Sequence, residues 1–255
     1  MTAIERKFHE LFPNFNGEYL DLVDYDIKEL PDLPYLKNLN LEYSTLKKIP
    51  NLPNLEYLNL GFSGIKKLPD LPNLESLVLN RSKIKKLPEL KNLKALYLGN
   101  STIKELPIFK NLSLLNLGSS TIKKIPIFPK LHELDTSFSS SLKEIPSLPN
   151  LKFLDINTTP VVKIGDMELD YFYFKNNKIK SHDNWIFSER IGSRTGRTSY
   201  NIFYDKVICG CFKGTLEHFE IKVNRTYPLD CTEPHVRFRT EYLDFISLIK
   251  LKINL

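Results

Sequence analysis

The chain has 255 residues, a formal net charge of +6 and a pI near 9.0, a mildly basic balance that by itself selects no class of partner. No run of about 18 apolar residues occurs and the N-terminus lacks the apolar core of a secretory signal, so we expect neither a membrane span nor secretion. The three cysteines are an odd number and lie late in the chain, which predicts free thiols in a reducing, intracellular compartment.

Residues 2–12 predict a short amphipathic helix. Thr2 and Glu5 fit a capping box, and Pro13 follows the segment as a stop signal. The apolar stripe of this helix consists of Ile4, Phe8, Leu11 and Phe12. Because the repeats that follow would expose an open end of their core, we expect residues 1–16 to form an N-terminal helical cap. A helix that binds a partner is the alternative.

Residues 17–181 contain about nine copies of one unit with a period of 19 residues. In the copy that begins at Leu55, which we number as position one, Leu58 and Leu60 occupy positions four and six. This spacing predicts a short strand whose leucines face the interior. Prolines in the return segment exclude a regular helix, so that segment is expected to be extended or 3₁₀. A fixed period of this size indicates stacked units that cannot bury their apolar faces alone.

The unit resembles the leucine-rich repeat, whose signature is Leu-x-x-Leu-x-Leu-x-x-Asn/Cys-x-Leu, and its Leu-Pro steps are similar to the short bacterial type. The resemblance implies an α/β leucine-rich-repeat solenoid with a curved parallel β-sheet that binds partners by its concave strand face. At position nine the chain departs from the signature, because hydroxyl side chains replace asparagine in most copies. The row is Ser44, Ser63, Ser82, Ser101, Ser120, Ser139 and Thr159, with Asn177 in the last copy. We interpret it as an architectural ladder of hydroxyl groups bonded to neighbouring backbone.

One copy is a residue longer than the others. The spacing stretches to 20 residues near Ser139–Leu142, and the strand before it carries Thr136 where other copies carry leucine. We therefore expect a local bulge in this strand.

The outward-facing residues at positions three, five, seven and eight are our candidates for partner binding. They mix aromatic side chains with Asn and Asp, a composition typical of protein-binding surfaces. The candidates are Asn40, Tyr43, Tyr57, Asn59, Phe62, Arg81, Tyr97, Asn116, Asp135, Phe138, Asp155 and Tyr173. In the alternative interpretation the aromatic rings only stack on each other along the sheet.

Positions twelve and thirteen, on the return segment, carry lysine in most copies, and we call them the lysine rows. They are Lys28, Lys47, Lys66, Lys85, Lys104, Lys123, Lys143 and Lys180, and Lys48, Lys67, Lys86, Lys124 and Lys163. Stacking would place like charges about 5 Å apart, a spacing that could hold a polyanion. The simpler interpretation is a solvated surface copied with the repeat. No nucleic-acid-binding motif accompanies the rows, so we do not expect a nucleic-acid partner.

After residue 181 the repeats stop, and we expect residues 182–255 to form a small α+β module. Arg190, Arg194 and Arg197, with glycines between them, predict a flexible basic connection, and phosphate binding is the alternative.

The rest of this module predicts strands followed by two helices. The stretch 201–212 is rich in β-branched and aromatic residues and predicts a long strand or a strand pair. The first helix would be capped by Thr215, and the second would cover roughly residues 235–252. The first helix has Leu216, Phe219 and Val223 on its apolar face.

Residues 204–219 resemble an uncharacterised C-terminal domain of repeat proteins from large DNA viruses and some phages. The resemblance rests on Tyr204-Asp205-Lys206 and on the Cys-Gly-Cys-Phe-Lys-Gly-Thr-Leu core that begins at Cys209. It implies a viral or intracellular setting and no known chemistry.

The cysteines and histidines of the module could form a metal site or a catalytic pair. The residues concerned are Cys209, Cys211, Cys231, His218 and His235. Structural zinc sites favour two to four residues between cysteines, whereas Cys209 and Cys211 are separated by one. A Cys–His pair would also need an orienting group that the sequence does not show. We therefore expect cysteines packed in the core, with no metal, cofactor or enzymatic activity.

The sequence thus predicts a non-catalytic protein-protein interaction module that binds on the concave strand face, with an unknown oligomeric state. One alternative is a structural or assembly component, for example of a virus particle, that contacts its neighbours through the lysine rows or the C-terminal module. A second alternative is a cysteine-dependent enzyme.

Overall fold

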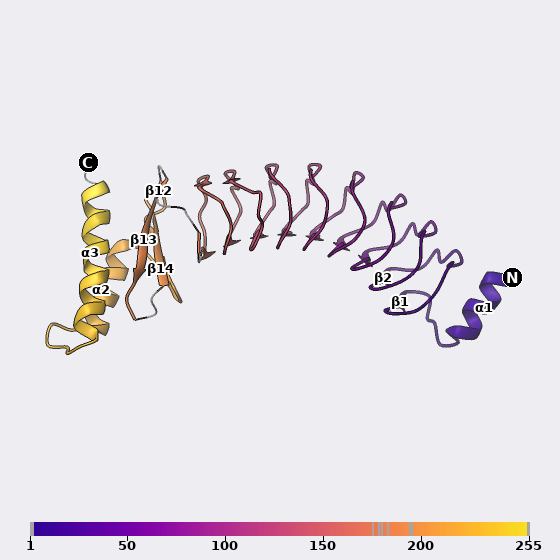
Figure 1. The fold of residues 1–255 in the computed structure, drawn as a ribbon, viewed down its shortest axis with the longest axis horizontal. Coiled ribbons are helices and arrows are strands. Elements are labelled where there is room, and N and C mark those ends of the chain that lie inside the picture. The colour runs from indigo at the N-terminus through magenta and orange to yellow at the C-terminus, as the bar shows by residue number, and fades with distance from the viewer. Residues whose placement is uncertain are drawn as a thin grey trace.

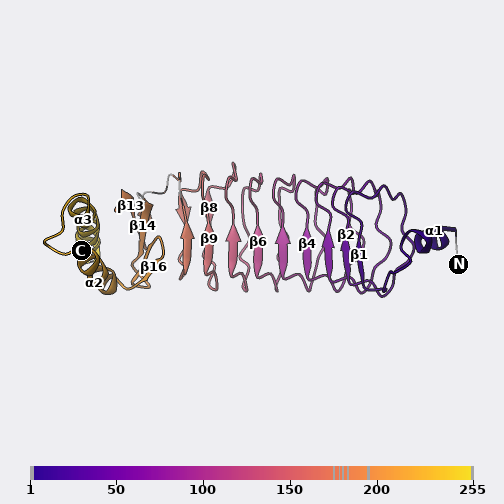
Figure 2. The ribbon, with the colours of Figure 1, turned by 90° about the horizontal axis from the view of Figure 1, so that it is seen from below.

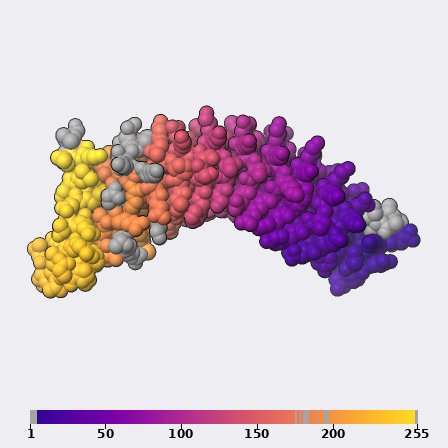
Figure 3. Space-filling view, viewed as in Figure 1, coloured from indigo at the N-terminus to yellow at the C-terminus, as the bar shows by residue number. Residues whose placement is uncertain are grey.

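The computed structural model describes residues 3–174, 176–177, 179, 181–182, 184–193 and 196–253. They form an arched solenoid with a helix at its N-terminal end and a sheet and two helices at its C-terminal end (Figure 1). The space-filling view shows that the arch is concave on the side where the strands lie (Figure 1 and Figure 3). The candidates Thr2, Lys180 and Arg194 lie outside the described residues.

Nine short parallel strands form the main sheet of the described chain, in the order β1-β2-β3-β4-β5-β6-β7-β9-β11. They are β1 (Tyr19–Asp21), β2 (Asn38–Asn40), β3 (Tyr57–Asn59), β4 (Ser76–Val78), β5 (Ala95–Tyr97), β6 (Leu114–Asn116), β7 (Glu133–Asp135), β9 (Phe153–Asp155) and β11 (Tyr171–Tyr173). Equivalent residues pair between copies, as Leu39 does with Leu58. The strands line the inner side of the arch, and Figure 2 looks onto this concave face. The predicted curved parallel sheet is confirmed.

The repeated leucines hold the stack together. Leu55, Leu58 and Leu60 are fully buried, and each such side chain contributes about 1.5–3 kcal/mol when it leaves water. The described return segments contain neither an α-helix nor a 3₁₀ helix, so the predicted exclusion of a regular helix is confirmed. On the convex side β8 (Glu144–Ile145) pairs with β10 (Lys163–Ile164).

The longer copy does not distort the sheet. β7 and β9 pair in continuous register, with Leu134 opposite Leu154, so the expected bulge at Thr136 is wrong. Thr136 is fully buried, and its hydroxyl donates to the carbonyl of Asp155 at 3.1 Å. The extra residue falls near Ser139–Leu142, between β7 and β8, so it lies outside both ladders of hydrogen bonds.

The hydroxyl row at position nine is buried along the whole solenoid, as an architectural role requires. Ser139 donates to the Leu117 carbonyl of the preceding turn at 2.8 Å. In the middle of the described solenoid, however, the buried hydroxyl groups of Ser63, Ser82 and Ser101 have no hydrogen-bond partner. The prediction of a continuous hydrogen-bonded ladder is therefore wrong for these turns, where the small side chain only fills the space.

An asparagine ladder exists at the other end of five strands. Asn54 donates to the Pro34 carbonyl of the preceding turn at 2.8 Å, and Asn73 donates to that of Pro53 at 2.9 Å. Asn92, Asn111 and Asn150 continue the ladder. The signal in the sequence was an asparagine directly before position one.

Position eight adopts a left-handed backbone conformation in all nine turns of the described solenoid. The residues, with φ between 53° and 61°, are Asp24, Tyr43, Phe62, Arg81, Asn100, Ser119, Phe138, Thr158 and Asn176. In the third turn the N–H of Ser63 bonds to the Leu60 carbonyl at 3.2 Å, which makes Phe62 the third residue of a tight turn. A type II turn requires positive φ at this place and favours glycine or asparagine there. Aromatic residues at position eight are therefore strained.

Replacing Phe138 by asparagine is expected to stabilise the protein by about 1 kcal/mol, because asparagine tolerates this conformation better than an aromatic residue. The Phe138 side chain is 61% exposed, so little buried apolar area is lost. Urea denaturation of the wild type and Phe138→Asn measures the difference. The converse variant, Asn100→Phe, should be less stable than wild type. Unchanged midpoints in both variants would show that the strain is negligible.

Helix α1 (Ala3–Leu11) covers the N-terminal end of the core. Phe8 is buried against the first turns, and Phe12 and Phe15 pack beside it. Leu11, predicted to lie on the apolar stripe, is instead exposed, because its side chain points away from the solenoid. The predicted N-terminal helix is confirmed.

A five-stranded antiparallel sheet and two helices follow the solenoid. The strands are β12 (Ser181–His182), β13 (Trp185–Ile191), β14 (Gly196–Asn201), β15 (Lys206–Cys209) and β16 (Phe212–Gly214), and the helices are α2 (Leu216–Thr226) and α3 (His235–Ile253). The Thr215 side chain caps α2 by accepting the His218 N–H at 3.2 Å, as predicted.

The predicted flexible basic connection is wrong, because β13 and β14 form a hairpin there with Arg190 opposite Arg197. Arg197 donates to the carbonyl oxygens of Ser188, Asn177 and Ile179. Its guanidinium therefore joins the hairpin to the last solenoid turn. Periodicity missed β13 because both of its faces are covered, so buried residues do not alternate with exposed ones.

The sheet lies between the solenoid and the helices (Figure 1). Trp185, Phe187 and Ile208 belong to the same core as the solenoid leucines. Ile186 and Val207, on the other face, pack with α2 and α3. The described core therefore continues across the predicted boundary at residue 182.

Candidate functional site

The concave face carries the candidate residues in three columns. Tyr57 is at position three, and Tyr97 and Tyr173 are at position five. Position eight, at the edge of the sheet, holds Tyr43 and Phe138, both exposed. The structure thus places these candidates on one continuous surface, although they come from turns far apart in sequence.

The Asn and Asp side chains at position five have a structural role that the sequence analysis missed. Asn40 accepts the N–H of Glu42 at 3.2 Å, and Asn59 accepts that of Gly61 at 2.9 Å. Asp21, Asn116, Asp135 and Asp155 make the same bond two residues ahead. Such bonds stabilise the turn that follows the strand. The signal in the sequence was the repeated Asn or Asp at position five. Its short side chain can reach the backbone N–H of position seven, which does not pair in the sheet.

In the turn that contains Tyr97, the N–H of position seven bonds to a side chain of the preceding turn instead. Tyr97 occupies position five and cannot accept the N–H of Gly99. The Asn80 side chain of the preceding turn accepts it instead, at 2.8 Å. The tyrosine ring is thereby left half-buried on the concave face.

Asn59 is the least accessible candidate, with 7% of its surface exposed. It donates to the Glu42 carboxylate at 3.2 Å. Burial raises the pKa of the neighbouring Tyr57 hydroxyl, and Glu42 raises it further. Tyr57 therefore remains a neutral hydrogen-bond donor at physiological pH.

Tyr43, Phe62 and Arg81 form a stack along the edge of the concave face. They occupy position eight of three successive turns. The rings of Tyr43 and Phe62 are 4.5 Å apart between centroids and inclined by 26°, and the Arg81 guanidinium carbon lies 5.2 Å from the Phe62 centroid. Tyr43 remains 49% exposed and Phe62 38% exposed. The stack therefore remains accessible to a partner, and its residues adopt the positive φ described above.

Farther along the arch, carboxylates of adjacent turns face each other. Asp135 and Asp155 pair directly in the sheet register. Burial raises the pKa of Asp155, the backbone N–H of Asn157 opposes that rise, and the charge of Asp135 adds to it. Asp135 and Asp155 therefore place like charges side by side in this column.

The last strand of the concave face meets the C-terminal sheet. The Phe153 ring lies 5.5 Å from that of Tyr173, and Lys213 of β16 lies 5.0 Å above the Tyr171 ring. Lys213 is a surface residue that the sequence analysis did not select, because only the tertiary fold brings it here.

Ion pairs tie the same end together. Lys206 of β15 bonds to Glu168 at 3.2 Å and to Asp170 at 2.9 Å, and Lys213 bonds to Asp170 at 3.4 Å. The hydrogen bond from Lys206 lowers the pKa of Asp170.

The lysine rows differ from the other repeated lysines in their partners. At position two, Lys37 pairs with Glu18 and Lys94 pairs with Glu75 of the preceding turn, at 3.1 and 2.6 Å. Within the described residues, no lysine of the two rows forms an ion pair, and all of them are exposed. The outer flank of the solenoid therefore carries uncompensated positive charge.

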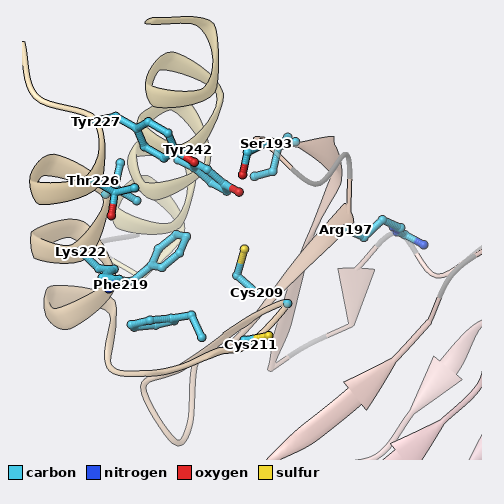
Figure 4. Close-up of a pocket in the computed structure, with 13 residues that line it drawn as sticks. Ser193, Arg197, Cys209, Cys211, Phe219, Lys222, Thr226, Tyr227 and Tyr242 are labelled. Atoms are coloured by element: carbon cyan, nitrogen blue, oxygen red, sulfur yellow. The ribbon is translucent and has the colours of Figure 1, made fainter. Parts of the chain in front are cut away.

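A small cavity of about 230 Å³ lies between the C-terminal sheet and the two helices (Figure 4). Cys209 points from the sheet toward Tyr242 and accepts a hydrogen bond from the Thr198 hydroxyl at 3.1 Å. Burial raises the pKa of Tyr242, and Cys209 raises it further. The tyrosine therefore stays neutral, and its hydroxyl and the thiol form a polar patch in an apolar cavity.

The three thiols are not in a disulfide, and they differ in exposure. Cys209 and Cys231 are half-buried, whereas Cys211 is exposed, so the expectation of core packing is wrong for Cys211. Among the described residues, no group of three His, Cys, Asp or Glu side chains is placed to hold a metal ion. His218 and His235 are exposed.

No described helix combines the length and apolar character that crossing a membrane would require.

Comparison with known proteins supports the fold. No family model and no curated protein matches the chain. Among solved structures it is similar to a leucine-rich-repeat protein of Leptospira interrogans, with 26% identity and a TM-score of 0.56 over 64% of this chain and 50% of that one. It is also similar to YopM from Yersinia enterocolitica, with 27% identity and a TM-score of 0.52 over 64% of this chain and 43% of that one.

The chain thus spans half or less of the length of these structures. The predicted resemblance of residues 204–219 to a viral domain finds no support in the comparisons and stays a prediction. The parallel sheet, the 19-residue spacing and the structural neighbours together show that the chain folds as a leucine-rich-repeat solenoid.

Proposed function

We propose that this protein is a non-catalytic interaction module that holds a protein partner on the concave strand face. Leucine-rich-repeat folds generally act as protein-interaction modules, which supports the proposal at the level of the fold. The C-terminal sheet serves in this proposal as the cap of the solenoid, since one of its faces shares the solenoid core, and the two helices cover its other face.

The observation that carries the proposal is the set of strained aromatic residues at the edge of the concave face. Tyr43, Phe62 and Phe138 adopt positive φ and remain exposed, so they contribute strain without the burial that would offset it. Strain of this kind is typical of functional surfaces. Aromatic side chains are also the ones most enriched at the centres of protein interfaces.

Alanine substitution at Tyr57, Phe62 and Tyr97 together tests the proposal. Affinity capture from the native cellular context, followed by mass spectrometry, should recover a specific partner with the wild type and lose it with this variant. The matched control replaces Ile108, Ile127 and Val162, exposed apolar residues outside the concave sheet, by alanine and should retain the partner.

The outcome that contradicts the proposal is retention of the partner by the concave variant and its loss by the control. A further variant replaces Lys66, Lys67, Lys85 and Lys86 by glutamine. If this variant loses the partner while the concave variant retains it, the result favours the assembly role through the lysine rows. Point variants suit this test better than truncation after residue 181, because truncation would remove Trp185, Phe187 and Ile208 and expose the solenoid core that they cover.

A further inference from the structure

We propose that the concave face selects a positively charged partner segment, one rich in arginine or lysine. This inference rests on the proposed function and adds the chemistry of the partner to it.

The charges of the concave face are almost all negative. In the columns at positions three, five, seven and eight, the acidic residues are Asp21, Asp24, Glu42, Glu133, Asp135 and Asp155. Arg81 is the basic residue among the described members of these columns. The negative face lies on a chain of net charge +6, so the charges are segregated by surface rather than mixed.

These carboxylates have no cation of their own. Within the described residues, none of the six takes part in an ion pair, whereas Glu18, Glu75 and Glu168 at the flank of the sheet are paired with lysines. The position-five carboxylates accept a backbone N–H with one oxygen and a bond from an uncharged side chain with the other, so their hydrogen bonds do not neutralise the negative charge. A row of uncompensated like charges raises the local concentration of an oppositely charged partner and directs its approach.

Aromatic rings lie beside the carboxylates. Glu133 pairs in register with Phe153, and the Tyr19 hydroxyl donates to the Asp21 carboxylate at 3.4 Å. A ring next to a carboxylate offers a cation both a negative partner and a negative π-face. Arginine and lysine side chains satisfy both, because their charged ends are borne on apolar stems.

The chain's own cations on this surface show that the rings accept such contacts. Arg81 lies over Phe62 at 5.2 Å, and Lys213 lies over Tyr171 at 5.0 Å. These contacts lie far apart on the arch, near β3 and at β11. The Tyr97 ring lies between these two contacts and the Tyr19 ring lies beyond the first. Among the described residues, neither ring has such a cation.

Binding of a defined probe to the full-length protein tests the inference. The probe is a fluorescein-labelled peptide of repeating Arg-Ser dipeptides, followed by fluorescence anisotropy, with a Glu-Ser peptide as its opposite. We expect the Arg-Ser peptide to bind and the Glu-Ser peptide not to bind. Raising the salt concentration from about 0.05 M to about 0.3 M should weaken binding, because it shortens the range of the electrostatic attraction.

A charge-neutral variant locates the site. Glu133→Gln, Asp135→Asn and Asp155→Asn together preserve shape and the side-chain acceptors of the turns, and should weaken Arg-Ser binding about tenfold. The matched control, Asp70→Asn, Glu89→Gln and Glu105→Gln, removes the same charge outside the concave sheet and should bind as the wild type does. Equal binding by the two variants, or binding of both peptides alike by the wild type, would overturn the inference.

The same variant separates this inference from the proposed function. If the charge-neutral variant still captures the native partner while the Tyr57, Phe62 and Tyr97 variant does not, the face binds a partner but charge does not select it. A second copy of this chain, docking by its lysine rows, is the other possible cation source. Sedimentation velocity showing salt-sensitive self-association of the wild type that the charge-neutral variant abolishes would replace the proposed partner by a second copy.

Discussion

Trp185→Ala should destabilise the protein by about 3–5 kcal/mol, the range for removing a large buried aromatic side chain. Trp185 is 1% exposed, and its ring centroid lies 5.4 Å from that of Phe172 and 6.0 Å from that of Phe187. The contact with Phe172 joins the last solenoid strand, β11, to β13. The indole N–H has no acceptor among the described residues, so the variant loses packing rather than a hydrogen bond.

The loss should appear first at the C-terminal end. Guanidinium denaturation measures the change in the free energy of unfolding, and hydrogen exchange of α2 and α3 shows where protection is lost. Phe203→Ala removes an exposed aromatic residue of the same module and serves as the control. If Trp185→Ala is no less stable than this control, the solenoid and the C-terminal sheet do not share a core.

Gly165→Ala, on the convex side, should lower the free energy of unfolding by about 3 kcal/mol. A Cβ at residue 165 would overlap the backbone nitrogen and Cα of Ser147 in the preceding turn. The Gly165 N–H also donates to the Ile145 carbonyl at 2.8 Å, so the two backbones cannot separate without breaking this bond. Backbone, unlike a flexible side chain, cannot rotate out of the way.

Gly64→Ala is the matched control for this prediction. A Cβ at Gly64 would meet no atom within 4 Å, and its φ is not in the left-handed region. This variant should be more stable than the wild type by about 0.5 kcal/mol in the free energy of unfolding, because alanine reduces the conformational freedom of the unfolded chain. Thermal unfolding of both variants beside the wild type gives the comparison. Equal melting temperatures for the two variants would contradict the close backbone approach at Gly165.

The repeat made the solenoid predictable, because nine copies repeat the same local information. The spacing of Leu58 and Leu60 sets the strand and its buried side, and the prolines exclude a helix on the return. Local patterns were equally sufficient for α1 and for α2, whose Thr215 cap and apolar face are the predicted ones.

The failures have a common physical cause, which is dependence on contacts between distant segments. β13 was missed because the solenoid covers one of its faces and the helices cover the other. The hydroxyl row was expected to be hydrogen-bonded throughout, but whether Ser82 reaches a carbonyl depends on the distance between turns. Periodicity gives the order of the turns and does not give that distance.

For the candidate site, the sequence alone determined which residues point outward from the strands, because alternation along a strand is a local property. The tertiary structure decided what those residues can do. Stacking turns brought Tyr43, Phe62 and Arg81 into one cluster, engaged the position-five side chains in turns, and placed Lys213 over Tyr171. It also separated the uncompensated carboxylates of the concave face from the lysine rows, since charge segregation depends on where each segment lies in space and not on its order in the chain.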